Sequence, residues 1–305
     1  MTSGRIVKAM SGFYYVKPDG SEKPDTPPKS ADGTYQCRAR GLFRKKKISP
    51  LVGDWVLFEV TDTDDVEGNV VGIQDRKNAL IRPQVANVDQ ALVIFAVHTP
   101  EPALDLLDRF LIEMRRQGID VILVFNKDDL GGPEELDRFR RIYKGADVGI
   151  LFTSVVNDTG IDNLRDLLKG KITTVAGPSG AGKSSIINSL SGKEAMVTGE
   201  ISRKIGRGKQ TTRHVELIEV QEDSYIIDTP GFSSLELPGI ESSELDLYFP
   251  EIGRYKNMCY YTGCSHISEP DCKVKQMLAE GEIPEERYGS YRLFYEEISK
   301  RRRYQ

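Results

Sequence analysis

The spacing of apolar and polar residues divides the chain into three parts, and the first part contains short strands. Four runs rich in β-branched and aromatic residues are separated by Gly, Pro and Asp, which favours strands over helices. Such strands predict a small β-barrel, because closure removes exposed strand edges. The runs are FYYVK (13–17), TYQCRAR (34–40), DWVLFEV (54–60) and NVVGIQ (69–74).

From about residue 86, near-continuous apolar runs alternate with amphipathic helical stretches such as ALDLLDRFLIEMRRQ (103–117). Buried strands between such helices predict an α/β domain whose parallel sheet is covered on both faces. After DTPGFSSLEL (228–237) the chain becomes mainly helical and carries cysteines. The predicted buried strands are ALVIFAV (91–97), VILVF (121–125), GILFTS (149–154), ITTVAG (172–177) and SYIIDT (224–229).

Composition narrows the class of protein. A chain of 305 residues is long enough for two or three domains. Its net charge is 42 − 46 = −4, so the overall charge does not indicate a nucleic-acid partner. No apolar run reaches the roughly 18 residues of a membrane span, and MTSGRIVKAM lacks the apolar core of a signal peptide. We therefore expect a cytosolic protein whose clustered cysteines indicate metal binding rather than disulfides.

The strongest motif is GPSGAGKS, which fills every fixed position of the phosphate loop G-x-x-x-x-G-K-[ST]. It lies between a strand and the helix SSIINSL (184–190), the context that the motif requires. Backbone N–H groups of such a loop surround phosphates, Lys183 reaches the β- and γ-phosphates, and Ser184 binds Mg²⁺. The predicted phosphate-binding residues are Gly177, Pro178, Ser179, Gly180, Ala181, Gly182, Lys183, Ser184 and Ser185.

A second loop, NKDD, predicts that the base is guanine. It comprises Asn126, Lys127, Asp128 and Asp129, and it ends the strand VILVF. The Asp129 carboxylate can accept from guanine N1–H and the 2-amino group, whereas adenine would leave it unpaired, a difference worth roughly 10⁴-fold. Lys127 is expected along the base, Asn126 between the two loops, and Ser154 near guanine O6. Alone, four polar residues after a strand usually form a turn, but the phosphate loop favours the base-reading interpretation.

The switch elements come next. In DTPG, Asp228 is expected to hold a Mg²⁺-bound water and the N–H of Gly231 to contact the γ-phosphate. GRGKQTTRH (206–214) offers Thr211 and Thr212 for the Mg²⁺ shell, although a basic solvated loop is the alternative.

Hydrolysis itself lacks an obvious water-orienting residue. Phe232 follows DTPG where Ras-like enzymes use glutamine, so we expect slow intrinsic hydrolysis that depends on a partner. Gln210 or His214 could supply the missing contact, or both could be exposed loop residues without a catalytic part. The remaining candidates for the hydrolytic site are Lys183 and Thr212.

The order of these motifs is unusual, because the base-reading loop precedes the phosphate loop. A sheet tolerates a new starting point when its original ends lay close together and the new ends fall in exposed loops. The order therefore predicts a circularly permuted GTPase domain.

The C-terminal cysteines have the spacing C-x₄-C-x-H-x₅-C. Four protein ligands leave no open coordination position, so the pattern predicts structural zinc rather than catalytic zinc. Unligated core thiols are the alternative, and Cys37, alone in a strand, is expected to be a small core residue. The predicted zinc ligands are Cys259, Cys264, His266 and Cys272.

Two basic stretches leave two readings open. CRARGLFRKKK (37–47), with Tyr35 and Phe43, resembles an oligonucleotide-binding face, and YRLFYEEISKRRRYQ (291–305) also mixes aromatic and cationic residues. Such patches favour RNA, but each is also explained by charge that keeps the protein soluble.

The permuted order combined with this zinc spacing resembles the RsgA (YjeQ) family over essentially the whole chain. The resemblance implies an OB-fold RNA-binding domain (1–76), a circularly permuted GTPase domain (77–240) and a zinc-binding domain (241–305). It also implies a cytoplasmic protein that acts late in maturation of the small ribosomal subunit, contacts rRNA and hydrolyses GTP when the subunit stimulates it. We expect Mg²⁺ to bind with GTP and the protein to be a monomer. The family usually has histidine before the two switch threonines, where this chain has Gln210.

The leading prediction is therefore a GTPase that produces GDP and phosphate. The alternative is an RNA-binding assembly scaffold in which GTP is a bound switch with negligible turnover. A nucleic-acid enzyme driven by ATP would require Asp129 to have no part in base recognition.

Overall fold

The computed structural model describes residues 1–20, 33–41, 43, 48–62, 67–80, 84–192, 215–228, 237 and 239–302. The chain forms two compact units, each assembled from three stretches of sequence. One unit contains Met1–Gln90, Arg165–Val175 and Ile187–Thr229, and the other contains Ala91–Leu164, Ala176–Ile186 and Pro230–Gln305. Within the described ranges, no helix has both the length and the apolar character needed to cross a membrane.

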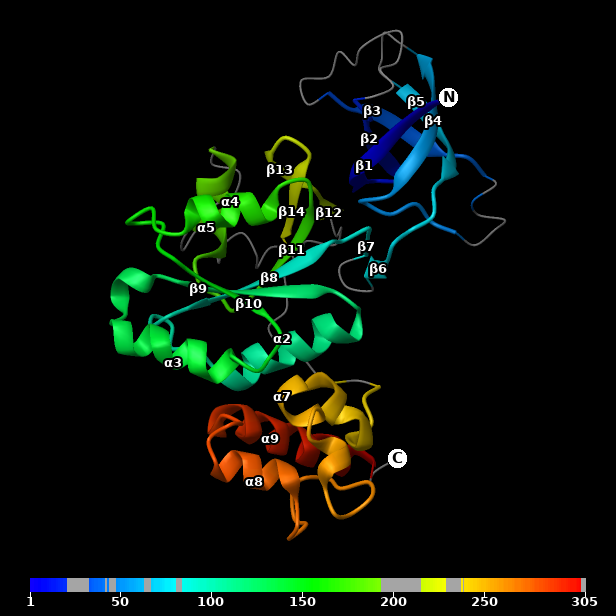
Figure 1. The fold of residues 1–305 in the computed structure, drawn as a ribbon. Coiled ribbons are helices and arrows are strands. Elements are labelled where there is room, and N and C mark those ends of the chain that lie inside the picture. Colours follow the sequence, from blue (N-terminus) through cyan, green and yellow to red (C-terminus); the bar gives the residue numbers. More distant parts are fainter. Residues whose placement is uncertain are drawn as a thin grey trace. The chain divides into compact units, whose positions relative to one another are not determined.

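Five N-terminal strands of the first unit close into a barrel (Figure 1). The strand order is β1-β2-β3-β5-β4, and β1 also pairs with β4, which closes the sheet. Ile6, Val16 and Phe58 are fully buried inside it. The predicted barrel is confirmed, but its first strand was not predicted, because Gly4, Arg5 and Lys8 obscure the alternation there. The strands are β1 Thr2–Met10, β2 Phe13–Pro18, β3 Tyr35–Ala39, β4 Trp55–Asp62 and β5 Glu67–Ile73.

The structure corrects the part that two aromatic residues were expected to take in a nucleic-acid face of this barrel. Tyr35 and Phe43 are only 2% and 8% exposed, so they belong to the core and cannot stack on a ligand. The alternation of side chains along β3 explains this result, because Tyr35 and the buried Cys37 point inward. Arg38, between inward positions, is exposed and lies 4.7 Å from the ring of Phe13.

The central strands are divided between the two units. In the first unit, β11 runs parallel to β14, and β13 pairs with β14 in the antiparallel sense. In the second unit, β9 and β10 are parallel, with Asn126 opposite Thr153 at their ends. The predicted strands in this region are present. The elements are β6 Ala79–Leu80, β7 Val85–Ala86, β8 Gln90–Ala96, α2 Leu104–Arg116, β9 Asp120–Asn126, the 3₁₀ turn η1 Asp128–Leu130, α3 Pro133–Tyr143, β10 Gly149–Thr153, α4 Ile161–Leu168, β11 Ile172–Ala176, α5 Lys183–Ser191, β12 Val215–Glu216, β13 Ile218–Gln221 and β14 Ser224–Asp228.

The C-terminal region is helical, as predicted, and belongs to the second unit (Figure 1). Its buried core includes Phe249, Ile252 and Phe294, and α2 contributes Ile112 to the same cluster. The elements are η2 Ser242–Tyr248, α7 Pro250–Gly253, η3 Lys256–Met258, α8 Lys273–Ala279 and α9 Glu285–Arg302.

A buried ion network joins α2 to the C-terminal helices. The guanidinium of Arg287 donates to Asp108 and, at 2.6 Å, to Glu251, and all three residues are at most 2% exposed. Tyr143 also donates to Asp108, at 3.1 Å. Burial by itself lowers the pKa of Arg287, but the two carboxylates outweigh that effect and raise the pKa. Arg287 therefore remains charged at any pH at which the protein is folded.

Replacing Arg287 should destabilise the second unit strongly. We expect Arg287→Ala to lower the free energy of unfolding by about 3–5 kcal/mol, because two buried carboxylates lose their cation. Arg138→Ala is the matched control, because Arg138 pairs with Glu286 on the surface at 3.5 Å. Its loss should lower the free energy of unfolding by no more than about 1 kcal/mol. Urea unfolding followed by tyrosine fluorescence measures the free energy of unfolding of both variants, and an equal decrease in the two would contradict the expectation.

Candidate functional site

The phosphate loop lies between the fully buried strand β11 and the start of α5, which is the strand–loop–helix context that the sequence predicts. Gly177 and Gly182 have φ angles of +142° and +91°, which favour glycine. A Cβ at Gly177 would lie 2.0 Å from the carbonyl oxygen of Ile94, and one at Gly182 would lie 2.1 Å from Nδ2 of Asn126. Ile94 and Asn126 therefore approach the backbone of the phosphate loop so closely that only glycine fits at residues 177 and 182.

Lys183 lies over the loop that precedes it. Its Nζ donates to the carbonyl oxygens of Gly177, at 3.0 Å, and Pro178, at 2.8 Å. Ser184 and Ser185 follow in the first turn of α5 and are half-buried, while Ser179 and Gly180 are exposed. The loop thus combines a cation, hydroxyls and accessible backbone, which are the groups that bind phosphate.

Asn126 joins the second loop to the first. Its side chain is 2% exposed, and Nδ2 donates to the carbonyl oxygen of Ala181 at 2.9 Å. Its Oδ1 accepts from Thr153 Oγ1 at 3.1 Å. The expected tie between the two loops is present, and both hydrogen-bonding ends of the amide are used.

Lys127 makes a second link between the loops. Its backbone is left-handed, with φ of +61°, and its Nζ donates to the carbonyl oxygens of Gly180, at 2.9 Å, and Thr99. Thr99 and Thr153 are the partners that sequence reasoning did not assign. Thr153 could have been found, because it directly precedes Ser154 at the end of a buried strand, whereas a backbone carbonyl acceptor such as that of Thr99 has no sequence signal.

Asp129 lies in η1, after Lys127, and is exposed. Ser154 Oγ donates to its Oδ1 at 2.5 Å and accepts the N–H of Asn157 at 3.1 Å. Burial, followed by the charge of Asp129, raises the pKa of the adjacent Asp128. The structure therefore brings Asp129 and Ser154 together, with the carboxylate accessible to a ligand.

Several predicted residues are outside these observations. The strand β14 ends at Asp228, as expected, but its side chain is outside the described part of the chain. The same holds for Gly231 and for the whole segment that contains Gln210, Thr211, Thr212 and His214.

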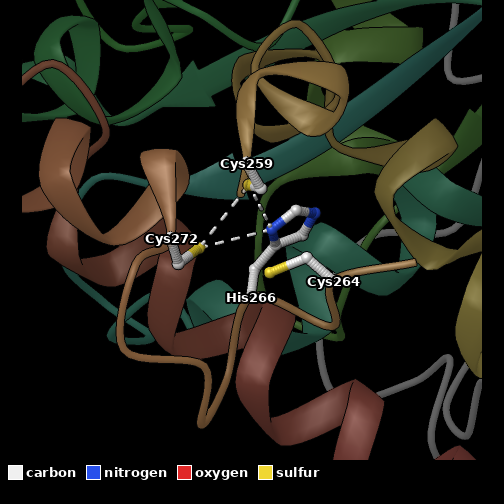
Figure 2. A group of neighbouring side chains, drawn as sticks. All are labelled: Cys259, Cys264, His266 and Cys272. Carbon is white, nitrogen blue, oxygen red and sulfur yellow. Dashed lines mark hydrogen bonds between the residues drawn. The ribbon is translucent and has the colours of Figure 1, made fainter. Parts of the chain in front are cut away.

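The four predicted metal ligands converge in the C-terminal region (Figure 2). Their ligand atoms lie within 4.8 Å of one another, and they are Cys259, Cys264, His266 and Cys272. Nδ1 of His266 lies 3.5 Å from the sulfurs of both Cys259 and Cys272, and those two sulfurs are 3.9 Å apart. The buried Nε2 of His266 has no hydrogen-bond partner among the described residues.

This donor set fits a tetrahedral zinc ion. With bonds of ~2.3 Å to sulfur and ~2.0 Å to nitrogen, tetrahedral geometry separates two sulfurs by roughly 3.8 Å and a sulfur from a nitrogen by roughly 3.5 Å. Among Cys259, His266 and Cys272, the observed separations of 3.9 and 3.5 Å agree with both values. Burial raises the pKa of Cys264 to about 12 and also raises that of Cys272, so a metal must displace their protons. The cluster is therefore a possible metal site consistent with zinc.

Residues around the ligands hold the metal loop in place. Ser265 donates to Glu269 through its backbone N–H and its hydroxyl, both at 2.8 Å, and the N–H of Ile267 donates at 3.2 Å. Burial raises the pKa of Glu269, but these hydrogen bonds outweigh burial and lower it to about 2. From α9, Tyr288 and Tyr291 donate to the carbonyl oxygens of His266 and Ser265, at 2.7 and 3.0 Å.

Comparison with known proteins identifies the family. The family model described as RsgA GTPase matches residues 73–238, and that of the RsgA N-terminal domain matches residues 3–68. The chain is 49% identical over 303 residues to the small ribosomal subunit biogenesis GTPase RsgA of Agathobacter rectalis, covering 99% of this chain and 100% of that one. The corresponding protein of Geobacillus kaustophilus is 44% identical over 305 residues, with 99% of each chain covered.

Two solved structures are similar as well. YjeQ from Thermotoga maritima has a TM-score of 0.78 and 32% identity, covering 97% of this chain and 98% of its own. YloQ, which is described as a circularly permuted GTPase, has a TM-score of 0.77 and 37% identity, covering 99% of this chain and 96% of its own. The predicted combination of an N-terminal barrel, a central GTPase domain and a helical region with a Cys₃His cluster is confirmed. The chain belongs to the RsgA GTPase family.

Proposed function

We propose that this protein hydrolyses GTP to GDP and phosphate on the small ribosomal subunit, late in maturation of that particle and in contact with its rRNA. The observation that carries the proposal is the hydrogen bond from Asn126 to Ala181, by which a guanine-type loop and a phosphate loop share one site. The relatives named above are small ribosomal subunit biogenesis GTPases, which supports the choice of particle. We place the protein in the cytoplasm and expect it to act as a monomer.

Guanine recognition in this proposal rests on Asp129 and Ser154. The carboxylate of Asp129 accepts from guanine N1–H and the 2-amino group, and Ser154 with the following backbone N–H contacts O6. The hydrogen bond between the two side chains supports this assignment, because it orients the carboxylate before the base arrives. Lys127, anchored on Gly180, packs its aliphatic stem along the base, and Asp128 completes the loop.

Phosphate binding uses the phosphate loop described above. The ammonium of Lys183 exchanges two neutral carbonyl partners for charged phosphate oxygens, and charge-assisted hydrogen bonds are the stronger kind. Ser184 and Thr212 are the proposed Mg²⁺ ligands, with Asp228 on a metal-bound water. The N–H of Gly231 contacts the γ-phosphate, and Mg²⁺ supplies charge neutralisation there.

Partner-dependent hydrolysis follows from the absence of glutamine after DTPG, where this chain has Phe232. Thr211 and Thr212 belong to the proposed switch, and either Gln210 or His214 orients the attacking water. The subunit is proposed to complete this arrangement.

We propose a domain division at about residues 76 and 240, with structural zinc in the C-terminal domain. Three thiolates and the Nδ1 of His266 would hold the ion, which supplies folding free energy to a region of about sixty residues. The agreement of the ligand separations with tetrahedral geometry supports zinc.

The decisive experiment is GTP turnover with and without purified small ribosomal subunits. We expect the subunits to raise kcat by at least about tenfold, since partner contacts on GTPases can supply far larger factors. Large subunits are the matched control and should leave the rate unchanged. A negligible rate that small subunits do not raise would favour the RNA-binding scaffold instead.

Base recognition can be tested by Asp129→Asn. The amide presents a donor to guanine, so GTP affinity should fall by roughly 10²-fold or more, while xanthosine triphosphate should bind better than it does to the unaltered protein. The control is Asp137→Asn, an exposed aspartate on α3. Titration with fluorescent nucleotides measures both affinities, and unchanged GTP binding by Asp129→Asn would exclude the assignment.

Retention of the metal should depend on Glu269. We expect Glu269→Gln to speed the transfer of zinc to a chromogenic chelator at neutral pH by about 10–100-fold, because residues that orient metal ligands commonly have effects of this size. Glu280→Gln, at an exposed position of the same region, is the control. Equal transfer rates for the two variants would show that the Glu269 hydrogen bonds do not hold the metal loop.

A further inference from the structure

The barrel is hydrogen-bonded to the strand that directly follows the switch segment. Strand β12 pairs with the second half of β1 in the antiparallel sense, with Lys8 opposite Glu216 and Ala9 opposite Val215. The N–H of Leu217 donates to the carbonyl oxygen of Val7 at 2.7 Å. Both strands belong to the first compact unit, so this contact lies within one body.

Two ion pairs reinforce the strand pairing. Lys8 lies 3.2 Å from Glu216, and Lys17, on β2, lies 2.6 Å from Glu219, on β13. The side chains of these residues are 30–52% exposed. Burial by itself lowers the pKa of Lys17, but the interactions with Glu219 and Tyr225 together outweigh burial, and the pKa is raised. Neither pair is deeply buried, so each is a weak interaction by itself, and the backbone pairing must supply part of the attachment.

Aromatic contacts extend the attachment to β14. The guanidinium of Arg5 lies 4.4 Å from the ring of Trp55 and 5.5 Å from the ring of Tyr225, which is 4% exposed. Lys17 also lies 5.6 Å from the Tyr225 ring. A cation over an aromatic ring is attracted by the face of the ring, more strongly where the pair is desolvated. The barrel thus contacts both ends of the segment from β12 to β14.

In the sequence, these contacts lie between the two proposed switch positions. Thr212 precedes Val215, the first residue of β12, by three positions. At the other end, β14 passes Tyr225 and ends at Asp228. The strands that are held on the barrel are therefore those that adjoin, in the sequence, the residues proposed to complete the Mg²⁺ site.

We propose that Lys8 and Lys17 are positioning residues for GTP hydrolysis: through Glu216 and Glu219 they fix the strands next to the switch on the barrel. The proposal rests on the proposed function, because it concerns how the reaction stimulated by the small subunit is supported by this chain's own contacts. By linkage, the nucleotide state changes the subunit affinity of the barrel by the same factor by which the subunit changes nucleotide affinity.

Charge reversal tests the proposal. In the variant Lys8→Glu/Lys17→Glu, both pairs become repulsive, and kcat in the presence of small subunits should fall about fivefold or more, while KM for GTP stays within about twofold of the unaltered protein. Adding Glu216→Lys and Glu219→Lys restores attraction and should return kcat to within about twofold. Arg140→Glu, which breaks an exposed pair with Asp137 on α3, is the control and should change neither constant.

A cross-strand disulfide distinguishes a positioning role of Lys8 and Lys17 from direct binding of these lysines to RNA. Ala9→Cys/Val215→Cys joins two directly opposed residues, and in the Lys8→Glu/Lys17→Glu background its oxidised form should restore stimulated kcat, while its reduced form should not. Each single cysteine variant, treated with the same oxidant, controls for damage to the metal ligands.

The outcomes are distinct. If neither the four-residue reversal nor the disulfide restores kcat, the lysines act on RNA phosphates directly, and the proposal is wrong. Unchanged stimulation in Lys8→Glu/Lys17→Glu also overturns it. Absence of stimulation in the unaltered protein would instead remove the proposed function itself.

Discussion

The proposed nucleotide site depends on one buried amide, the side chain of Asn126. It donates to the carbonyl oxygen of Ala181 and accepts from Thr153, so it joins the ends of two parallel strands to the phosphate loop. A net contribution of about 1 kcal/mol is usual for such a hydrogen bond, but leaving the buried partner unsatisfied costs about 1–3 kcal/mol. Gly182 makes the approach possible, because any Cβ there would collide with the amide. Two loops separated by some fifty residues thus form one site.

A continuous set of contacts leads from this site to the metal-binding region. Lys127 reaches from Gly180 of the phosphate loop to the carbonyl oxygen of Thr99, a few residues before α2. Helix α2 then carries Asp108 to Arg287 of α9, and α9 holds the metal loop through Tyr288 and Tyr291. Within the second unit, the metal-binding region is therefore connected to the loop of Asn126 and Lys127 through α2. Within the first unit, β12 is paired with the barrel.

Residues whose chemistry requires a particular spacing could be predicted from the sequence, and residues defined by packing could not. The phosphate loop, NKDD and the Cys₃His cluster were found because each ligand imposes its own pattern of donors. Tyr35 and Phe43 were misassigned, because an aromatic residue in a basic stretch has the same sequence signal in a core as on a binding face. Strand β1 and its pairing with β12 were missed, since the pairing partners are more than two hundred residues apart.

By itself, the sequence determined the ligand chemistry of this protein and the permuted order of its motifs, because local spacing and strand–loop–helix context are properties of short segments. The tertiary structure alone decided how the parts are held together. The Asp108–Arg287–Glu251 network and the Lys8–Glu216 pair join segments distant in the chain. Whether a charged side chain is buried in an ion pair or exposed to solvent depends on which element packs against it, and only the tertiary structure sets that packing.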